Sequence, residues 1–214
     1  ESVIRNLHKT ILSDVSALKQ ETSLKAILAD LIGYCTQISD AFEKIKHNQI
    51  GTCIKYVNGD ISNLSNLYIT TLCRDVHSRN ARRDFDKSKI KDRLLGNSDF
   101  KRIFELVNDN KPYNELYYCE NRLATKHQYT NTHLNTELTS SFWGYFKRSK
   151  LWPLPYQSTI VVPILTPDGK ISAFLCIDSP KAKGFNKEQD VPIVQEIALF
   201  LTDLISHVCI KHLS

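Results

Sequence analysis

The chain has 214 residues, of which 42% are hydrophobic and 24% charged, and its net charge is +5. This composition is typical of a globular domain and excludes a disordered, collagen-like or small disulfide-stabilised protein. No apolar stretch approaches the ~20 residues that span a bilayer, so we expect a soluble, cytoplasmic protein. The chain begins at Glu1 and contains no methionine, which suggests a piece of a longer protein.

The first 50 residues carry two helical patterns. Apolar residues recur every three or four positions from Val3 to Leu18, which is the spacing of a narrow stripe on one side of a helix. A broader stripe follows from Leu24 to Ile45. Thr22 and Ser23 offer a cap between the two, but no Pro or Gly forces a break, so one long helix bent near residue 21 is the alternative. We expect Gly51 to end this helical region.

Two short strands and a less regular middle follow. Residues Thr52–Val57 and Leu67–Leu72 are rich in β-branched and aromatic side chains and are separated by turn-forming residues, so they predict two antiparallel strands. The middle of the chain, residues 74–150, predicts a helix, a strand and a second helix, at Asp99–Val107, Leu116–Cys119 and Leu138–Phe146.

Most of the excess positive charge lies in one segment. Residues Arg79–Arg93 contain seven basic and three acidic side chains, a net charge of +4. A solvated loop or helix face is the simpler interpretation, and attraction of an anionic ligand is the alternative. The segment lacks interleaved aromatic residues and any nucleic-acid motif, so we expect no nucleic-acid partner.

The last third predicts a central hairpin and a long helix. Ser158–Leu165 and Ile171–Asp178 are almost wholly apolar and are joined by a Pro-Asp-Gly turn, so both faces of this hairpin should be covered. Asp190 is predicted to cap the final helix, with Pro192 in its first turn. The helix then carries an unbroken apolar stripe to Val208.

The stretch Tyr156–Asp190 resembles the second half of a GAF domain, the α/β ligand-sensing module of signalling proteins. The resemblance rests on YQSTIVVPI at residues 156–164, ISAFLCIDS at residues 171–179, and Phe185 and Asp190 before the long helix. It covers about residues 22–214. Ala173 stands where the family often has Gly, and the elements of cyclic-nucleotide members are matched only loosely. The cysteine set of the sulfoxide-reducing members has no counterpart.

The resemblance implies an α/β (α+β) fold with a central antiparallel sheet. The N- and C-terminal helices pack on one face, and a ligand pocket lies on the other under the middle segment. Residues 1–21 then extend the first helix as a signalling and dimerisation helix, and their stripe has no partner within the sensory domain of residues 22–214. We therefore expect a parallel homodimer through the terminal helices.

Nine residues bordering the implied pocket are the candidate ligand-binding residues. Aromatic walls with a few convergent polar groups are typical of small-molecule sites, although the same side chains also occur as ordinary core or strand ends. Asp178 is the most informative of them, because an acidic group directly after an apolar run must be solvated, paired or ligand-bound. The set is Tyr117, Tyr118, Asn121, Phe142, Trp143, Ser158, Thr159, Cys176 and Asp178.

The six cysteines are widely spread, without the two-residue spacing of metal knuckles or redox motifs, so we expect buried, reduced thiols. They are Cys35, Cys53, Cys73, Cys119, Cys176 and Cys209. Nor does the spacing of His127 and His133 match a common zinc pattern, and no cofactor is indicated.

No nucleophile motif adjoins any of the seven histidines. We therefore expect a non-catalytic sensory module that regulates an output domain of its parent protein. Its expected ligand is a small molecule, with an anion slightly favoured. The alternatives are a small cysteine-based redox enzyme of the same fold and a dimerisation scaffold without ligand.

Overall fold

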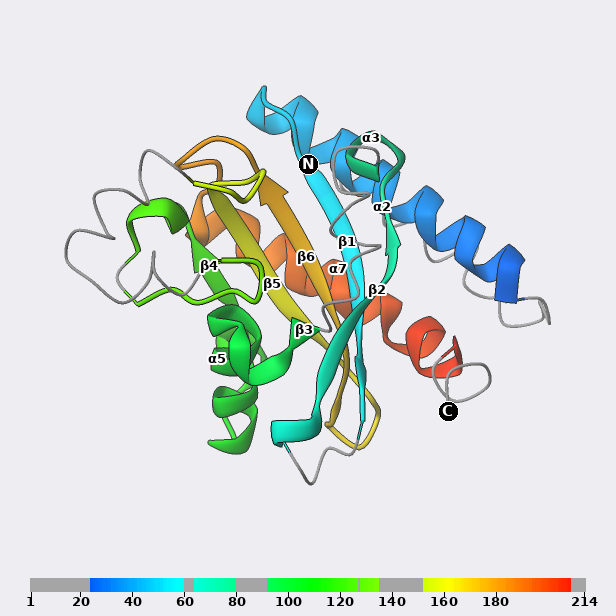
Figure 1. Cartoon of the computed structure of the whole chain (residues 1–214). Coiled ribbons are helices and arrows are strands. Elements are labelled where there is room, and N and C mark those ends of the chain that lie inside the picture. Colours follow the sequence, from blue (N-terminus) through cyan, green and yellow to red (C-terminus); the bar gives the residue numbers. More distant parts are fainter. Residues whose placement is uncertain (1–23, 60–63, 80–91, 127, 135–151, 209–214) are drawn as a thin grey trace.

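A six-stranded antiparallel sheet lies at the centre of the computed structural model, which describes residues 24–59, 64–79, 92–126, 128–134 and 152–208 (Figure 1). The strand order is β3-β2-β1-β6-β5-β4, and every neighbouring pair is antiparallel. The strands are β1 (Gly51–Asn58), β2 (Tyr68–Arg74), β3 (Asp92–Arg93), β4 (Tyr118–Glu120), β5 (Ser158–Leu165) and β6 (Ile171–Ser179).

Helices cover both faces of this sheet. The long helices α2 (Leu24–Lys46) and α7 (Lys187–Val208) lie behind it in Figure 1, and α5 (Ser98–Asn108) lies in front, beside β4 and β5. A short helix α3 (Val76–Arg79) follows β2. Four single-turn 3₁₀ helices complete the described elements: η1 (Leu64–Asn66), η2 (Leu94–Gly96), η3 (Tyr113–Glu115) and η4 (Leu123–Thr125).

The larger hydrophobic core lies between the sheet and the two long helices. Alternate residues of β6, namely Ala173, Leu175 and Ile177, point into it, as do Ile160, Val162 and Ile164 of β5. The stripes of α2 and α7 pack against them. Apolar side chains at every second strand position and at every third or fourth helix position therefore pack together in one layer.

The central hairpin is confirmed. β5 pairs with β6 over eight positions, and β6 lies between β5 and β1. Both strands are buried over almost their whole length, as expected for a strand covered on both faces. The joining turn uses Gly169 at φ +79°, a conformation that favours glycine.

The start of α7 differs from the prediction. Asn186, and not Asp190, caps it, because the Asn186 side chain accepts hydrogen bonds from the backbone N–H groups of Glu188 and Gln189. Asp190 reaches back to the Asn186 N–H at 2.6 Å and pairs with Lys46 of α2 at 2.6 Å. Pro192 is the sixth helical residue and so lies beyond the first turn.

Other boundaries shift by a few residues. α2 ends at Lys46, and Gly51 begins β1. The predicted strand Leu116–Cys119 is the shorter β4, Tyr118–Glu120, whereas α5 matches its prediction closely. The predicted helices at 1–21 and 138–146, most of the basic segment, His127 and Cys209 lie outside the described residues. Within the described residues, no helix is long and apolar enough to cross a membrane.

Candidate functional site

The face of the sheet that packs on α5 begins apolar and becomes polar toward one end. Phe174 of β6 packs against Phe100 of α5 in a tilted arrangement, with ring centroids 4.8 Å apart. Cys176 and Asp178 follow Phe174 at every second position of β6 and lie on the same face of the sheet. Polar side chains of β1 and β5 lie beside them, so the alternation of three adjacent strands builds one polar patch.

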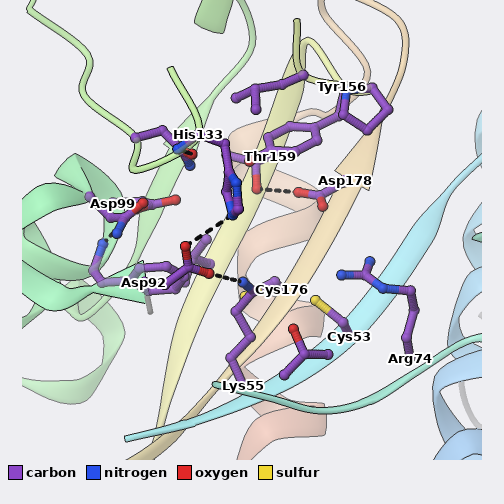
Figure 2. Close-up of a pocket in the computed structure, with 17 residues that line it drawn as sticks. Cys53, Lys55, Arg74, Asp92, Asp99, His133, Tyr156, Thr159, Cys176 and Asp178 are labelled. Carbon is purple, nitrogen blue, oxygen red and sulfur yellow. Dashed lines mark hydrogen bonds and ion pairs between the residues drawn. The ribbon is translucent and has the colours of Figure 1, made fainter. Parts of the chain in front are cut away.

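This patch lines a cavity of about 50 Å³ (Figure 2). The sheet supplies its floor, and β3, α5 and the segments around His133 and Tyr156 supply its walls. The volume suits a few water molecules or a very small ligand and is far below the ~300 Å³ at which drug-sized pockets begin. Its polar or ionisable lining residues include Cys53, Lys55, Arg74, Asp92, Asp99, His133, Tyr156, Thr159, Cys176 and Asp178.

Asp92 bridges two of these groups. One carboxylate oxygen, Oδ2, lies 3.1 Å from Lys55 Nζ, and the other, Oδ1, lies 3.0 Å from His133 Nε2. Burial alone would raise the pKa of Asp92, but His133 and Lys55 together hold it below its ordinary value. Burial likewise disfavours the Lys55 ammonium, yet the Asp92 carboxylate raises the pKa of Lys55. The pair therefore stays ionised across the neutral range.

Asp99 behaves differently, although it lies in the same cavity. It is 4% exposed in the first turn of α5, and burial raises its pKa to about 7. Its Oδ1 accepts the backbone N–H of Phe100 at 2.9 Å, which offsets part of that rise. Asp99 therefore changes its charge near neutral pH.

The other end of the cavity carries Arg74, Asp178 and a pair of thiols. Thr159 Oγ1 donates to Asp178 Oδ1 at 2.7 Å across the β5–β6 ladder. Cys53 of β1 lies directly opposite Cys176 of β6. A hydrogen bond from Cys176 lowers the pKa of Cys53 to about 7 against the effect of burial, with Arg74 and Lys55 assisting.

The structure gathers three of the nine predicted site residues at this cavity: Thr159, Cys176 and Asp178. Ser158 instead donates to the Lys181 carbonyl at 2.8 Å. The Asn121 side chain makes two hydrogen bonds with the Phe185 backbone, at 2.8 and 3.0 Å. Both side chains therefore hold loops together.

Tyr117 and Tyr118 point to opposite faces of the sheet. Lys187 Nζ lies 5.3 Å from the Tyr117 ring centroid, and Tyr118 packs against Tyr129, with centroids 6.4 Å apart. The two tyrosines line a separate open groove rather than the polar cavity. Phe142 and Trp143 lie outside the described residues.

Sequence reasoning missed most of the polar lining. Lys55, Asp92, Asp99 and His133 come from four separate segments, and only the fold brings them together. Asp92 lies within the predicted basic segment, and His133 was considered only as a metal ligand. Among the described residues, no group of three His, Cys, Asp or Glu side chains is arranged to hold a metal ion.

No family model and no curated protein matches the chain. Solved structures do match over nearly its full length. The GAF domain of a phosphoenolpyruvate-protein phosphotransferase from Acinetobacter is 10% identical, with a TM-score of 0.53 over 97% of this chain and 92% of that one. The corresponding domain from Coxiella burnetii is 11% identical, with a TM-score of 0.52 over 99% of both chains.

These similarities, together with the strand order and helix placement, show that the chain has the GAF-domain fold. The free methionine-R-sulfoxide reductase of Neisseria meningitidis also aligns, at 12% identity and a TM-score of 0.49 over 95% of this chain and 90% of that one. A fold of this kind does not by itself define a function, which depends on the residues of the cavity.

Proposed function

We propose that the chain is a sensory domain that binds a small polar molecule in the cavity between the sheet and α5. The observation that carries this proposal is the concentration of ionisable groups there. Arg74, Asp99 and Asp178 are each less than 8% exposed and line one cavity, on a sheet whose opposite face is apolar. Burying so many charges is costly for folding and is typical of binding sites.

The ligand class follows from the volume and the cations. A cavity of about 50 Å³ excludes a nucleotide in the arrangement described here. Arg74 and Lys55 both face it (Figure 2), and a guanidinium matches the two oxygens of a carboxylate. We therefore narrow the expected anion to a small carboxylic acid.

The bound state would pass to the helices through β1. Its residues Cys53 and Lys55 line the cavity, and between them Ile54 packs into the core formed with α2 and α7. Ser39 of α2 also donates to the Thr52 hydroxyl at 2.8 Å. A shift of β1 would therefore displace α2 directly.

The helices α2 and α7 are the expected route from the cavity to an output domain. The start of α2 and the end of α7 lie on the same side of the molecule (Figure 1). In this proposal the two helices act in a homodimer, relay the signal to an output domain of the parent protein, and do so in the cytoplasm. The five described cysteines are free thiols, which supports a reducing compartment.

A thermal-shift screen tests the ligand. Small mono- and dicarboxylic acids are expected to raise the melting temperature saturably, and nucleotides are not. Arg74→Gln should abolish the shift. The matched control is Arg102→Gln on the exposed side of α5, where the side chain is 54% exposed, and it should leave the shift intact.

A screen in which no carboxylic acid shifts the melting temperature would refute the ligand class and favour a scaffold. An Arg74→Gln variant that responds like the parent would refute the cavity as the site. Catalytic turnover of any added acid would refute a purely sensory role.

The dimer is tested on the whole chain by light scattering over a range of concentrations. Ile11→Asp, in the apolar stripe of residues 3–18, is expected to convert the dimer to a monomer without a change in ligand response. A parent chain that stays monomeric at high micromolar concentration would refute the dimer.

A further inference from the structure

The Cys53–Cys176 pair is the least explained feature of the cavity. The antiparallel register places the two residues directly opposite each other on β1 and β6, and both thiols line the cavity (Figure 2). A small-molecule sensor does not need two adjacent thiols in its floor.

The backbone geometry permits a bond between them. Directly opposed residues of an antiparallel ladder have Cα atoms about 4.5 or 5.5 Å apart, depending on the pair type. Disulfides span Cα separations of roughly 4.4–6.8 Å, so either pair type suffices without strand movement. The cavity also supplies space beside the sulfur atoms.

The two thiols differ in reactivity. The hydrogen bond from Cys176 lowers the pKa of Cys53 to about 7, so Cys53 forms the thiolate more readily than its partner does. The same contact, together with burial, raises the pKa of Cys176 well above its ordinary value. Cys53 is thus equipped to attack, and Cys176 to follow as the second thiol.

A second thiol pair in the same chain lacks these properties. Cys35 of α2 and Cys73 of β2 have their sulfur atoms 3.7 Å apart. They lie in the apolar core on the other face of the sheet, outside the cavity. The hydrogen bond with Cys73 and burial raise the pKa of Cys35 well above its ordinary value. Proximity alone therefore does not make a reactive pair.

We propose that Cys53 and Cys176 form a peroxide-reactive dithiol that hydrogen peroxide converts to a disulfide joining β1 to β6. The Cys53 thiolate attacks one peroxide oxygen and the O–O bond breaks. The leaving hydroxide takes up the proton released by Cys53 and departs as water, leaving a sulfenic acid.

The Cys176 sulfur then attacks the Cys53 sulfur, the S–S bond forms, and the S–O bond breaks. The hydroxyl leaves with the Cys176 proton as a second water. Two thiols are oxidised by two electrons in total, and one peroxide is reduced to two waters.

The size of the cavity determines which peroxides can reach the two thiols. A volume of about 50 Å³ admits hydrogen peroxide and excludes bulky organic hydroperoxides. Cumene hydroperoxide should therefore react at least roughly tenfold more slowly, although its peroxide bond is chemically similar.

The test uses the reduced whole chain, kept free of oxygen and treated with one equivalent of hydrogen peroxide at pH 7. The expected result is a mass loss of two hydrogens, a crosslinked peptide pair containing Cys53 and Cys176, and reversal by dithiothreitol. A crosslink that maps to Cys35 and Cys73, or native thiols that stay unreacted while unfolded chains react, would overturn the proposal.

Two variants sharpen this test. Cys176→Ala removes the hydrogen bond to Cys53, so peroxide consumption at pH 7 should fall severalfold, and a sulfenic acid on Cys53 should appear as a mass gain of one oxygen on the Cys53 peptide. Cys35→Ala is the matched control and should leave the rate and the crosslink unchanged. Loss of the reaction in Cys35→Ala would refute the assignment of Cys53 and Cys176 as the reactive pair. If Cys176→Ala fails to fold, the crosslinked peptides of the parent chain decide between the two thiol pairs.

Discussion

The two faces of the sheet are built from the same strands and yet have opposite character. Toward α2 and α7, the central strands present mainly aliphatic side chains such as Ile160, Leu175 and Ile177. Toward α5, the same strands begin with Phe174 and Val161 and end with Thr159, Cys176 and Asp178. One face is therefore almost wholly hydrophobic core, and the other combines a smaller core with the ionisable groups of the cavity.

The cysteines show the same division. Cys35 and Cys73 contribute to the apolar face as small hydrophobic side chains. Cys53 and Cys176 face the polar cavity, and their mutual contact lowers the pKa of Cys53 while it and burial raise the pKa of Cys176. In the redox proposal, the environment of each face, and not the residue type, decides whether a thiol is inert.

The largest expected effect comes from the apolar face. Leu175→Ala removes a fully buried side chain from the central strand and should lower the free energy of unfolding by about 3 kcal/mol. At this chain length the melting temperature should fall by roughly 6–12 °C. Leu199→Ala, at a position 52% exposed on α7, is the control and should change stability by less than about 0.5 kcal/mol. Equal effects of the two substitutions would contradict the assigned core.

A substitution on the polar face should act in the opposite direction. Asp99 has a pKa of about 7 in the folded chain and about 4 when unfolded, so folding loses stability as pH rises between these values. Asp99→Asn removes this penalty and should stabilise the protein by about 2 kcal/mol at pH 8, with little gain at pH 4.

Urea unfolding at both pH values measures this difference. Asp109→Asn, at an exposed position just after α5, should show no comparable pH dependence. A gain from Asp99→Asn that is the same at pH 4 and pH 8 would mean that removal of the charge is not its cause.

Thr159→Val removes one hydrogen bond from the floor of the cavity. The substitution keeps the shape of the side chain and removes the hydroxyl that donates to Asp178 at 2.7 Å, so we expect a cost of about 1.5 kcal/mol. Thr70→Val, at an exposed position of β2, is the matched control and should lie within about 0.5 kcal/mol of the parent. Thermal unfolding compares the two, and a neutral Thr159→Val would mean that Asp178 does not depend on this bond.

The apolar face was predictable because its signal is local. The runs at Ser158–Leu165 and Ile171–Asp178, with the Pro-Asp-Gly turn between them, define a buried hairpin within 21 consecutive residues. The long helices repeat their apolar stripes over many turns, so their existence was predictable as well. The cap of α7 was misplaced, because Asn186 and Asp190 both carry side chains suited to capping.

The polar face was predictable only where it lies on that hairpin. Thr159, Cys176 and Asp178 line the cavity and were predicted for this reason, and their role in ligand binding stays a prediction. Lys55, Asp92, Asp99 and His133 are scattered over 79 residues, and each alone is an ordinary surface residue type. Their meeting depends on strand register and on the placement of α5, which no local pattern encodes. The pairing of Cys53 with Cys176 likewise requires the β1–β6 register.

The smallest expected effect concerns Asn121, which was predicted as a ligand-binding residue and lies away from the cavity. Its side chain bonds the backbone N–H and C=O of Phe185 and so fixes the loop before α7. Asn121→Ala should cost about 1 kcal/mol, because both partners are backbone groups that water reaches in part. Asn108→Ala removes the same side-chain amide at an exposed position of α5, so this control should leave the free energy of unfolding nearly unchanged. Since Asn121 contributes no atom to the cavity lining, the thermal shift caused by a small carboxylic acid should be unchanged in the variant. An unchanged melting temperature combined with a lost ligand response would reverse this assignment and move the binding site from the sheet floor to the loop before α7.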